Sequence, residues 1–183
     1  MTALLRFDRV TCRRGGRLLF EDLGFELRPG EALQVRGPNG SGKSSLIRVA
    51  AGLLRPESGA VDASPLALAD DSLALDRELP LGRALAFWRG AIADALESLG
   101  LAELGDVPVR LLSAGQRKRA GLARVAASGA PLWLLDEPAN ALDQASVERL
   151  AALIDRHRAA GGAVLAASHS ALPGIWRMLE LGE

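Results

Sequence analysis

The stretch Gly37-Pro38-Asn39-Gly40-Ser41-Gly42-Lys43-Ser44 decides the fold of this 183-residue chain. It follows an apolar run at Ala32–Arg36, which we expect to be a buried strand, and it precedes a helical pattern at Ser44–Ala51. Glycines in such a loop let backbone N–H groups turn inward around phosphates, and the following helix adds its positive N-terminal end. The sequence therefore predicts a phosphate-binding loop between a strand and a helix.

The side chains of this loop suit a nucleotide triphosphate with its metal ion. Lys43 can reach the β- and γ-phosphates, and the Ser44 hydroxyl can ligate Mg²⁺. We therefore expect ATP and Mg²⁺ as ligands. The residues expected around the nucleotide are Gly37, Pro38, Asn39, Gly40, Ser41, Gly42, Lys43, Ser44 and Ser45.

A second candidate site follows the apolar run Leu132–Leu135, an expected strand that ends in two adjacent carboxylates, Asp136 and Glu137. An aspartate in this place can hold Mg²⁺ through its hydration shell, and we assign that role to Asp136. Glu137 would face the γ-phosphate and activate the attacking water as general base. Taken alone, such a pair is more often a solvated strand end, but the phosphate loop favours the catalytic interpretation.

The segment Leu112-Ser113-Ala114-Gly115-Gln116-Arg117-Lys118-Arg119 starts an expected helix. Ser113 is a plausible N-cap, and the small residues Ala114 and Gly115 would leave N–H groups open to an anion. A capped helix with a basic, solvated face would explain the same residues. The residues alone leave both interpretations open.

The order of apolar patterns predicts an α/β fold with a mainly parallel sheet covered by helices. We expect a single domain over residues 1–183, with an N-terminal antiparallel β region and an inserted helical subdomain over about 76–113. The remaining expected strands are Leu4–Val10, Leu18–Phe20, Phe25–Leu27 and Ala163–Ala167, and the remaining helices begin at Ala114 and span Ala145–Ala160.

Composition excludes several classes of protein. The 22 basic and 22 acidic side chains balance, so we expect no nucleic-acid partner. Cys12 is the only cysteine, which excludes an internal disulfide and fits a reducing compartment. No run approaches the roughly 18 apolar residues of a membrane span, and the N-terminus does not resemble a secretory signal, so membrane contact would need a partner.

In this order the motifs resemble those of ABC (ATP-binding cassette) ATPases, from about Leu4 to Leu181. In that family the segment at 112–119 is the signature motif, which binds the γ-phosphate of a nucleotide held by the other subunit of a head-to-tail dimer. The resemblance therefore implies a homodimer that hydrolyses ATP, with Ser113, Gly115 and Gln116 as nucleotide-binding residues. It also makes Asn140–Asp143 the loop that passes between the two sites, and His169 the switch histidine that contacts the γ-phosphate.

Two family features are missing. The family's glutamine before the helical subdomain is absent, and the corresponding stretch offers Asp70, Asp71 or Ser72 as substitute oxygen ligands, although a plain polar loop is equally consistent with it. The chain has no tyrosine, and the position of the adenine-stacking aromatic holds Arg14. A guanidinium can stack on a base, so we predict binding with relaxed selectivity between ATP and GTP.

Three local features resemble one branch of the family, the haem exporter ATPases of bacterial cytochrome c maturation: Cys12–Arg17 with Leu19-Phe20, Ala86–Trp88, and Leu132–Pro138 with Asn140–Asp143. This resemblance implies polytopic membrane permease subunits as partners and a peripheral location on the cytoplasmic face of the bacterial inner membrane. Nothing in the chain is typical of a haem site, so we expect no direct haem site here.

The sequence pattern also fits other functions. Export of a lipid, drug or metal would leave the same sequence pattern, and a non-transport ATP-binding clamp is a further alternative. The stretch Leu79–Arg89 is a candidate docking surface for the partner, and an amphipathic helix that packs inward explains it equally well.

Overall fold

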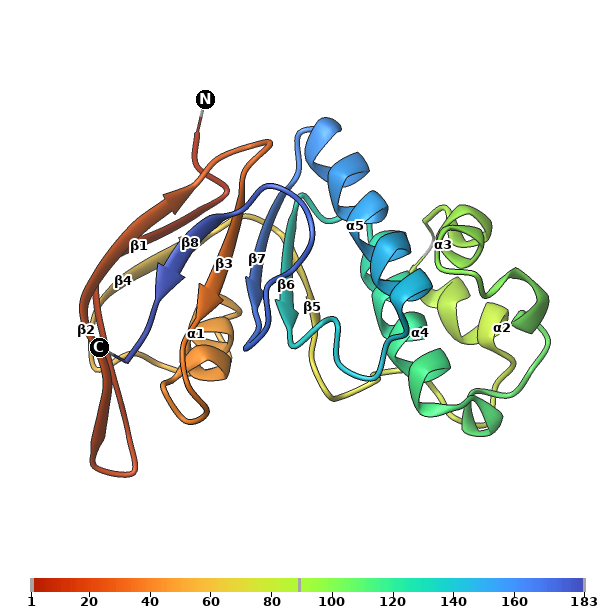
Figure 1. Ribbon diagram of the computed structural model, residues 1–183, viewed down its shortest axis with the longest axis horizontal. Helices are drawn as coiled ribbons and strands as arrows, with labels where there is room; N and C mark the ends of the chain where they lie inside the picture. The colour runs from red at the N-terminus through yellow and green to blue at the C-terminus, as the bar shows by residue number, and fades with distance from the viewer. Residues whose placement is uncertain (1, 89, 183) are drawn as a thin grey trace.

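The computed structural model describes residues 2–88 and 90–182, which form two sheets and the helices around them (Figure 1). The larger sheet has the order β5-β6-β7-β3-β8, and its neighbouring strands pair in parallel. This confirms the predicted α/β class. Its strands are β3 (Ala32–Arg36), β5 (Leu66–Ala69), β6 (Leu132–Asp136), β7 (Ala163–Ala167) and β8 (Arg177–Glu180).

The core lies on both faces of this sheet because side chains alternate along its central strands. On one face Leu134 and Leu165 pack with α1 (Lys43–Ala50) and the smaller sheet. On the other face Leu135 and Ala166 pack with α4 (Ala114–Ala127) and α5 (Gln144–Ala159). Figure 1 shows α1 between the two sheets and the other helices across the larger sheet.

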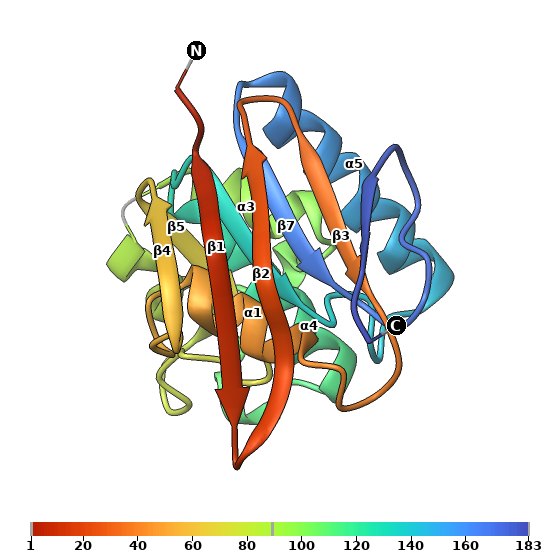
Figure 2. The ribbon, with the colours of Figure 1, turned by 90° about the vertical axis from the view of Figure 1, so that its left-hand side faces the viewer.

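The smaller sheet is antiparallel, with the order β2-β1-β4, and Figure 2 shows it from its outer side. Its strands are β1 (Leu5–Arg14), β2 (Arg17–Leu27) and β4 (Ser58–Ala63), and the predicted turn lies at Gly15-Gly16. The prediction of two short strands at Leu18–Phe20 and Phe25–Leu27 was wrong, because one strand runs through both. Asp22 adopts a φ of 50°, and its N–H donates to Thr11 Oγ1 at 3.2 Å. The pairing of β1 with β2 therefore continues past this irregularity, which looks like a turn in the sequence.

The helical character predicted for residues 76–113 is present in short pieces. These are α2 (Leu81–Leu85), α3 (Ile92–Ser98) and 3₁₀ turns at Ala86–Trp88, Ala102–Leu104 and Val109–Leu111. Helices α2 and α3 pack against α4, and Leu81 and Leu85 of α2 are fully buried. Among the described residues, no helix is both long enough and apolar enough to cross a membrane.

Candidate functional site: a nucleotide cleft at the phosphate loop

A cleft of about 620 Å³ opens where the loop between β3 and α1 meets the ends of β6 and β7. The carboxyl ends of parallel strands are where open α/β sheets bind ligands. The cleft brings together predicted residues from distant parts of the chain. Its lining is Arg14, Arg17, Leu19, Asn39, Gly40, Gly42, Lys43, Ser44, Ser45, Glu137, Asn140 and His169.

Glycine is required at several points of the loop by its backbone shape. Gly37, Gly40 and Gly42 have φ values of 145°, 81° and 106°, which residues with a Cβ atom rarely adopt. A Cβ on Gly37 would also collide with the carbonyl oxygen of Leu181 and with Ser41 Oγ. The loop is packed so tightly at Gly37 that any side chain there would distort it.

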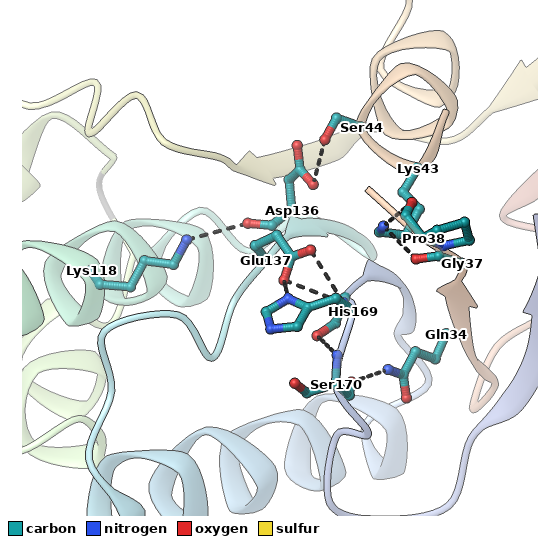
Figure 3. Close-up of polar contacts among 11 residues, drawn as sticks. Gln34, Gly37, Pro38, Lys43, Ser44, Lys118, Asp136, Glu137, His169 and Ser170 are labelled. Atoms are coloured by element: carbon teal, nitrogen blue, oxygen red, sulfur yellow. Dashed lines mark hydrogen bonds and ion pairs between the residues drawn. The ribbon is translucent and has the colours of Figure 1, made fainter. Parts of the chain in front are cut away.

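Lys43 extends back over this loop. Its side chain is buried, and Nζ donates to the carbonyl oxygens of Gly37 at 2.7 Å and Pro38 at 3.0 Å (Figure 3). These contacts hold the ammonium beside the loop that α1 follows. A positive charge, loop N–H groups and a helix N-terminus therefore converge on one place, which is suited to bind phosphates.

The hydroxyl of Ser44 donates to Asp136 Oδ1 at 3.1 Å and so joins α1 to the end of β6. Burial raises the pKa of Asp136, and the nearby charges of Glu137 and Asp71 add to the rise, whereas Ser44 and Lys118 oppose it. A carboxylate beside a hydroxyl fits Mg²⁺, which is usually held by one or two carboxylates, waters and substrate phosphates. No cluster of three or more His, Cys, Asp or Glu ligands occurs among the described residues.

Glu137 is held in an uncommon conformation next to His169. Its φ is 47°, and its N–H donates to the carbonyl oxygen of Ala167 at 2.8 Å. Its carboxylate accepts from the His169 N–H at 3.2 Å and contacts His169 Nδ1 at 2.9 Å. Figure 3 shows the two side chains facing each other. The pair fixes the direction of a carboxylate that also lines the cleft.

Gln34 holds the loop that follows His169, a role that was not predicted from the sequence. It lies in the middle of β3 and is 1% exposed. Its Nε2 donates to the carbonyl oxygen of Ser170 at 2.6 Å, and its Oε1 accepts from the N–H of Leu172 at 3.2 Å. The signal in the sequence was a single amide within an otherwise apolar strand.

The prediction that Ser113 caps a helix is confirmed. Ser113 Oγ accepts from the N–H of Gln116 at 3.2 Å, and Gln116 Oε1 accepts from the N–H of Ser113 at 2.8 Å, a complete capping box at the start of α4. None of Ser113, Gly115 and Gln116 is among the described residues that line the cleft. The structure therefore keeps these three apart from the phosphate loop of the same chain.

A second cavity, of about 220 Å³, is lined by part of the stretch that was expected to offer substitute ligands for the family's glutamine. Asp70 and Asp71 line it together with Lys118 and Asn140, and Asn140 also lines the larger cleft. Asp70 Oδ1 accepts from the N–H of Ser72 at 2.9 Å. Asp71 is the member of this stretch whose charge affects Asp136.

Arg14 lies in the cleft, as its predicted role requires, at the end of β1. Arg17 and Leu19 line the same cleft, and the sequence analysis gave neither of them a role there. In the stretch Leu79–Arg89, Leu81 and Leu85 are buried, as expected of a helix that packs inward. Phe87 is 79% exposed, so the same stretch also presents an apolar side chain at the surface. Arg89, the last residue of that stretch, lies outside the described residues.

Comparisons with known proteins show which family the chain is similar to. The profile of the family described as ABC transporter matches residues 20–140. A cytochrome c biogenesis ATP-binding export protein CcmA from Sphingopyxis alaskensis is 58% identical over 180 residues, which cover 94% of this chain and 93% of the relative. The protein of the same name from Zymomonas mobilis is 54% identical, with 93% of this chain and 80% of the relative covered.

Solved structures share the fold. A putative ABC transporter ATP-binding protein from Pyrococcus furiosus superposes with a TM-score of 0.85 at 21% identity and covers 97% of this chain and 96% of the other. The ATP-binding subunit of another ABC transporter superposes with a TM-score of 0.83 at 22% identity, with 91% of this chain and 79% of the other covered.

Proposed function

This chain belongs to the ABC transporter family and is one of its ATPases, and we propose that it drives haem export for cytochrome c maturation through membrane-embedded partners. The observation that carries the proposal is the 58% identity to a cytochrome c biogenesis export protein over nearly the full length of both chains. The cleft supports the ATPase part, because Lys43, Ser44, Glu137 and His169 line one cavity.

In the proposed reaction, Lys43 and the loop N–H groups bind the β- and γ-phosphates of ATP. Ser44 and Asp136 would hold Mg²⁺, which when bound neutralises charge that develops on the phosphates. Glu137 takes a proton from the attacking water as general base. His169 keeps the Glu137 carboxylate in place through the 2.9 Å contact and lies where it can reach the γ-phosphate.

We propose that the working unit is a homodimer. The cleft is lined by the phosphate loop and by the ends of β6 and β7, but not by the residues at the start of α4. A second copy arranged head to tail would bring its Ser113, Gly115 and Gln116 to the open side of the nucleotide. The capped N-terminus of α4 has the N–H groups and helix dipole that such an anion contact needs.

Haem would be handled by the partners rather than by this chain. The chain has two histidines. His157 is stacked on Trp133 with ring centroids 3.8 Å apart, and His169 contacts Glu137. Cys12 is buried inside the smaller sheet. The potential haem ligands of these types are therefore buried or already engaged.

The proposed function also includes the domain organisation, the membrane partners and the remaining nucleotide contacts. We propose that residues 1–183 act as one ABC ATPase domain, with 76–113 as the helical subdomain and the exposed Phe87 within the surface that meets polytopic permease subunits. The chain would then sit peripherally on the cytoplasmic face of the bacterial inner membrane. Asp70, Asp71 or Ser72 would take the place of the missing glutamine, and Asp70 and Asp71 line the cavity that Asn140 shares with the cleft. Arg14 would stack on the base at the end of the cleft.

The test is an affinity capture of tagged Glu137→Gln protein from native membranes in detergent with ATP, followed by identification of its partners by mass spectrometry. Recovery of polytopic membrane proteins together with haem-handling proteins is the expected result. Recovery of an unrelated permease would replace haem with another cargo, such as a lipid, drug or metal. Recovery of soluble proteins alone would favour a non-transport clamp and overturn the proposal.

A further inference from the structure

Lys118 makes a contact with the catalytic centre that none of the roles above uses. It comes from the second turn of α4, and its Nζ donates to the backbone carbonyl oxygen of Asp136 at 3.2 Å. Figure 3 shows the side chain reaching from α4 to the end of β6. The chain has 22 lysine and arginine residues, yet only Lys43 and Lys118 are lysines, and both lie at this site.

The contacted carbonyl belongs to the peptide that joins Asp136 to Glu137, the proposed metal-binding and water-activating carboxylates. This peptide is held on both sides, because its N–H donates to the carbonyl oxygen of Ala167 at 2.8 Å. Glu137 itself has a φ of 47°, a left-handed conformation that costs free energy for a residue with a side chain. Such a conformation persists only where its surroundings fix it, and Lys118 donates to the carbonyl of the peptide that precedes Glu137.

Lys118 lies among carboxylates that its ammonium group can face. Burial lowers the pKa of Lys118, but the nearby carboxylates of Asp71, Asp136, Glu137 and Asp70 oppose that change. Asp70 and Asp71 line the same cavity as Lys118. A compact ammonium on a flexible stem can meet a single carbonyl oxygen among these carboxylates, whereas a guanidinium carries a wider, planar set of donors.

We propose that Lys118 is a positioning residue for ATP hydrolysis, which holds the Asp136–Glu137 peptide so that the Glu137 carboxylate stays aimed at the attacking water. The proposal rests on the proposed function and deepens it. Lys118 would also connect the two nucleotide sites of the dimer. It lies on α4, whose first residues would meet the nucleotide of the second copy, and it contacts the catalytic centre of its own copy. A shift of α4 would thus be transmitted through one side chain to the general base.

The experiment compares three variants of the full chain with the wild type in a phosphate-release assay over a range of ATP concentrations. Lys118→Met removes the charge and keeps the length, and Lys118→Arg restores a cation. Arg158→Met is the matched control, because Arg158 also donates from a helix to a carbonyl, that of Gly30 at 3.0 Å, but lies away from the cleft.

We expect kcat of Lys118→Met to fall about tenfold or more with a less than about twofold change in KM, the size of one lost charged hydrogen bond felt in the transition state. Lys118→Arg should recover part of this loss, and Arg158→Met should keep the wild-type kcat. A thermal melt and the binding of a fluorescent ATP analogue establish that each variant is folded. If Lys118→Met does not fold, the kcat of Lys118→Arg decides: a partial loss of kcat with KM unchanged supports the positioning role, and a kcat equal to that of wild type contradicts it.

An unchanged kcat in folded Lys118→Met would overturn the positioning role and leave the proposed function intact. A kcat loss in Lys118→Arg as deep as in Lys118→Met would also overturn it, because the charge would then not matter. An inactive wild-type protein would instead contradict the proposed ATPase function, so the two failures can be told apart.

Discussion

Replacing Glu137 with glutamine removes the negative charge of the proposed general base and keeps its shape. The amide oxygen of the substituted side chain can still accept from the His169 N–H, which lies 3.2 Å from Oε1 in the wild type, so the loop should hold. The second contact, at 2.9 Å to Nδ1, loses its charge assistance. Because His169 is about half exposed, that loss should cost about 1 kcal/mol or less of folding free energy.

The effect on catalysis should be far larger than the effect on stability. General-base catalysis contributes roughly 10²- to 10⁴-fold, so we expect kcat for phosphate release to fall by about that factor. Binding of ATP should remain, because Lys43 and the loop N–H groups are untouched. The variant should therefore collect in an ATP-bound dimer, which light scattering would detect as a doubled mass that wild type shows only transiently.

The matched control is Glu148→Gln, the same substitution on the exposed surface of α5, where Glu148 accepts from Gln144 at 3.0 Å. It should leave kcat and the dimer unchanged. A Glu137→Gln protein that hydrolyses ATP at the wild-type rate would refute the assignment of Glu137 as general base.

Three further substitutions test other parts of the molecule. Arg14→Ala should bind a fluorescent ATP analogue about two- to fivefold more weakly, the size of an exposed cation–π contact, and comparable binding would rule out stacking. Ser113→Ala should lower the melting temperature by about 2–4 °C through the lost cap and prevent the ATP-bound dimer of Glu137→Gln; a dimer that persists would contradict the role of Ser113. Burial lowers the pKa of His157 below its usual value of 6.5, so the folded state binds fewer protons than the unfolded one. Stability should be full above pH of about 6.5 and fall below it, and the melting temperature of His157→Phe should decline less between about pH 7.5 and 5.5 than that of wild type; an equal decline would exclude His157 as the cause.

The elements nearest the site were predictable because their sequences carry strong local signals. The glycine loop, the strand at Leu132–Leu135 and the helix after Ser113 each combine an apolar pattern with turn or cap residues. The structure extends that strand by one residue to Asp136, and α1 starts at Lys43, one residue before its predicted start. Local chemistry decides these segments, and tertiary contacts only adjust their ends.

Three strands escaped prediction because partners, not their own pattern, make them strands. Most residues of β4 (Ser58–Ala63) are exposed, and it forms because β1 offers it a free edge. The four residues of β5 pair only with β6, and β8 pairs only with β3 at the end of the sheet. Segments this short, or this exposed, carry little signal until a neighbouring strand supplies hydrogen-bond partners.

The parts of the site that the sequence did not indicate are contacts over long distances in the chain. Gln34 contacts the loop after β7 through two hydrogen bonds, and Lys118 contacts the end of β6 through one, and no local spacing in the sequence encodes them. The pairing of Glu137 with His169 was expected only in the sense that both would face the γ-phosphate. Their direct contact depends on the parallel pairing of β6 with β7, which brings the two strand ends side by side.

Whether this ATPase drives haem export for cytochrome c maturation can be measured in the native host. The gene for this chain would be deleted and replaced by wild type, Glu137→Gln or Glu148→Gln, and covalently bound haem in c-type cytochromes measured by haem staining of membrane proteins. We expect c-type cytochromes to be lost on deletion, to recover with wild type and with Glu148→Gln, and not to recover with Glu137→Gln. Normal c-type cytochromes in the deletion strain would contradict the proposed role in haem export.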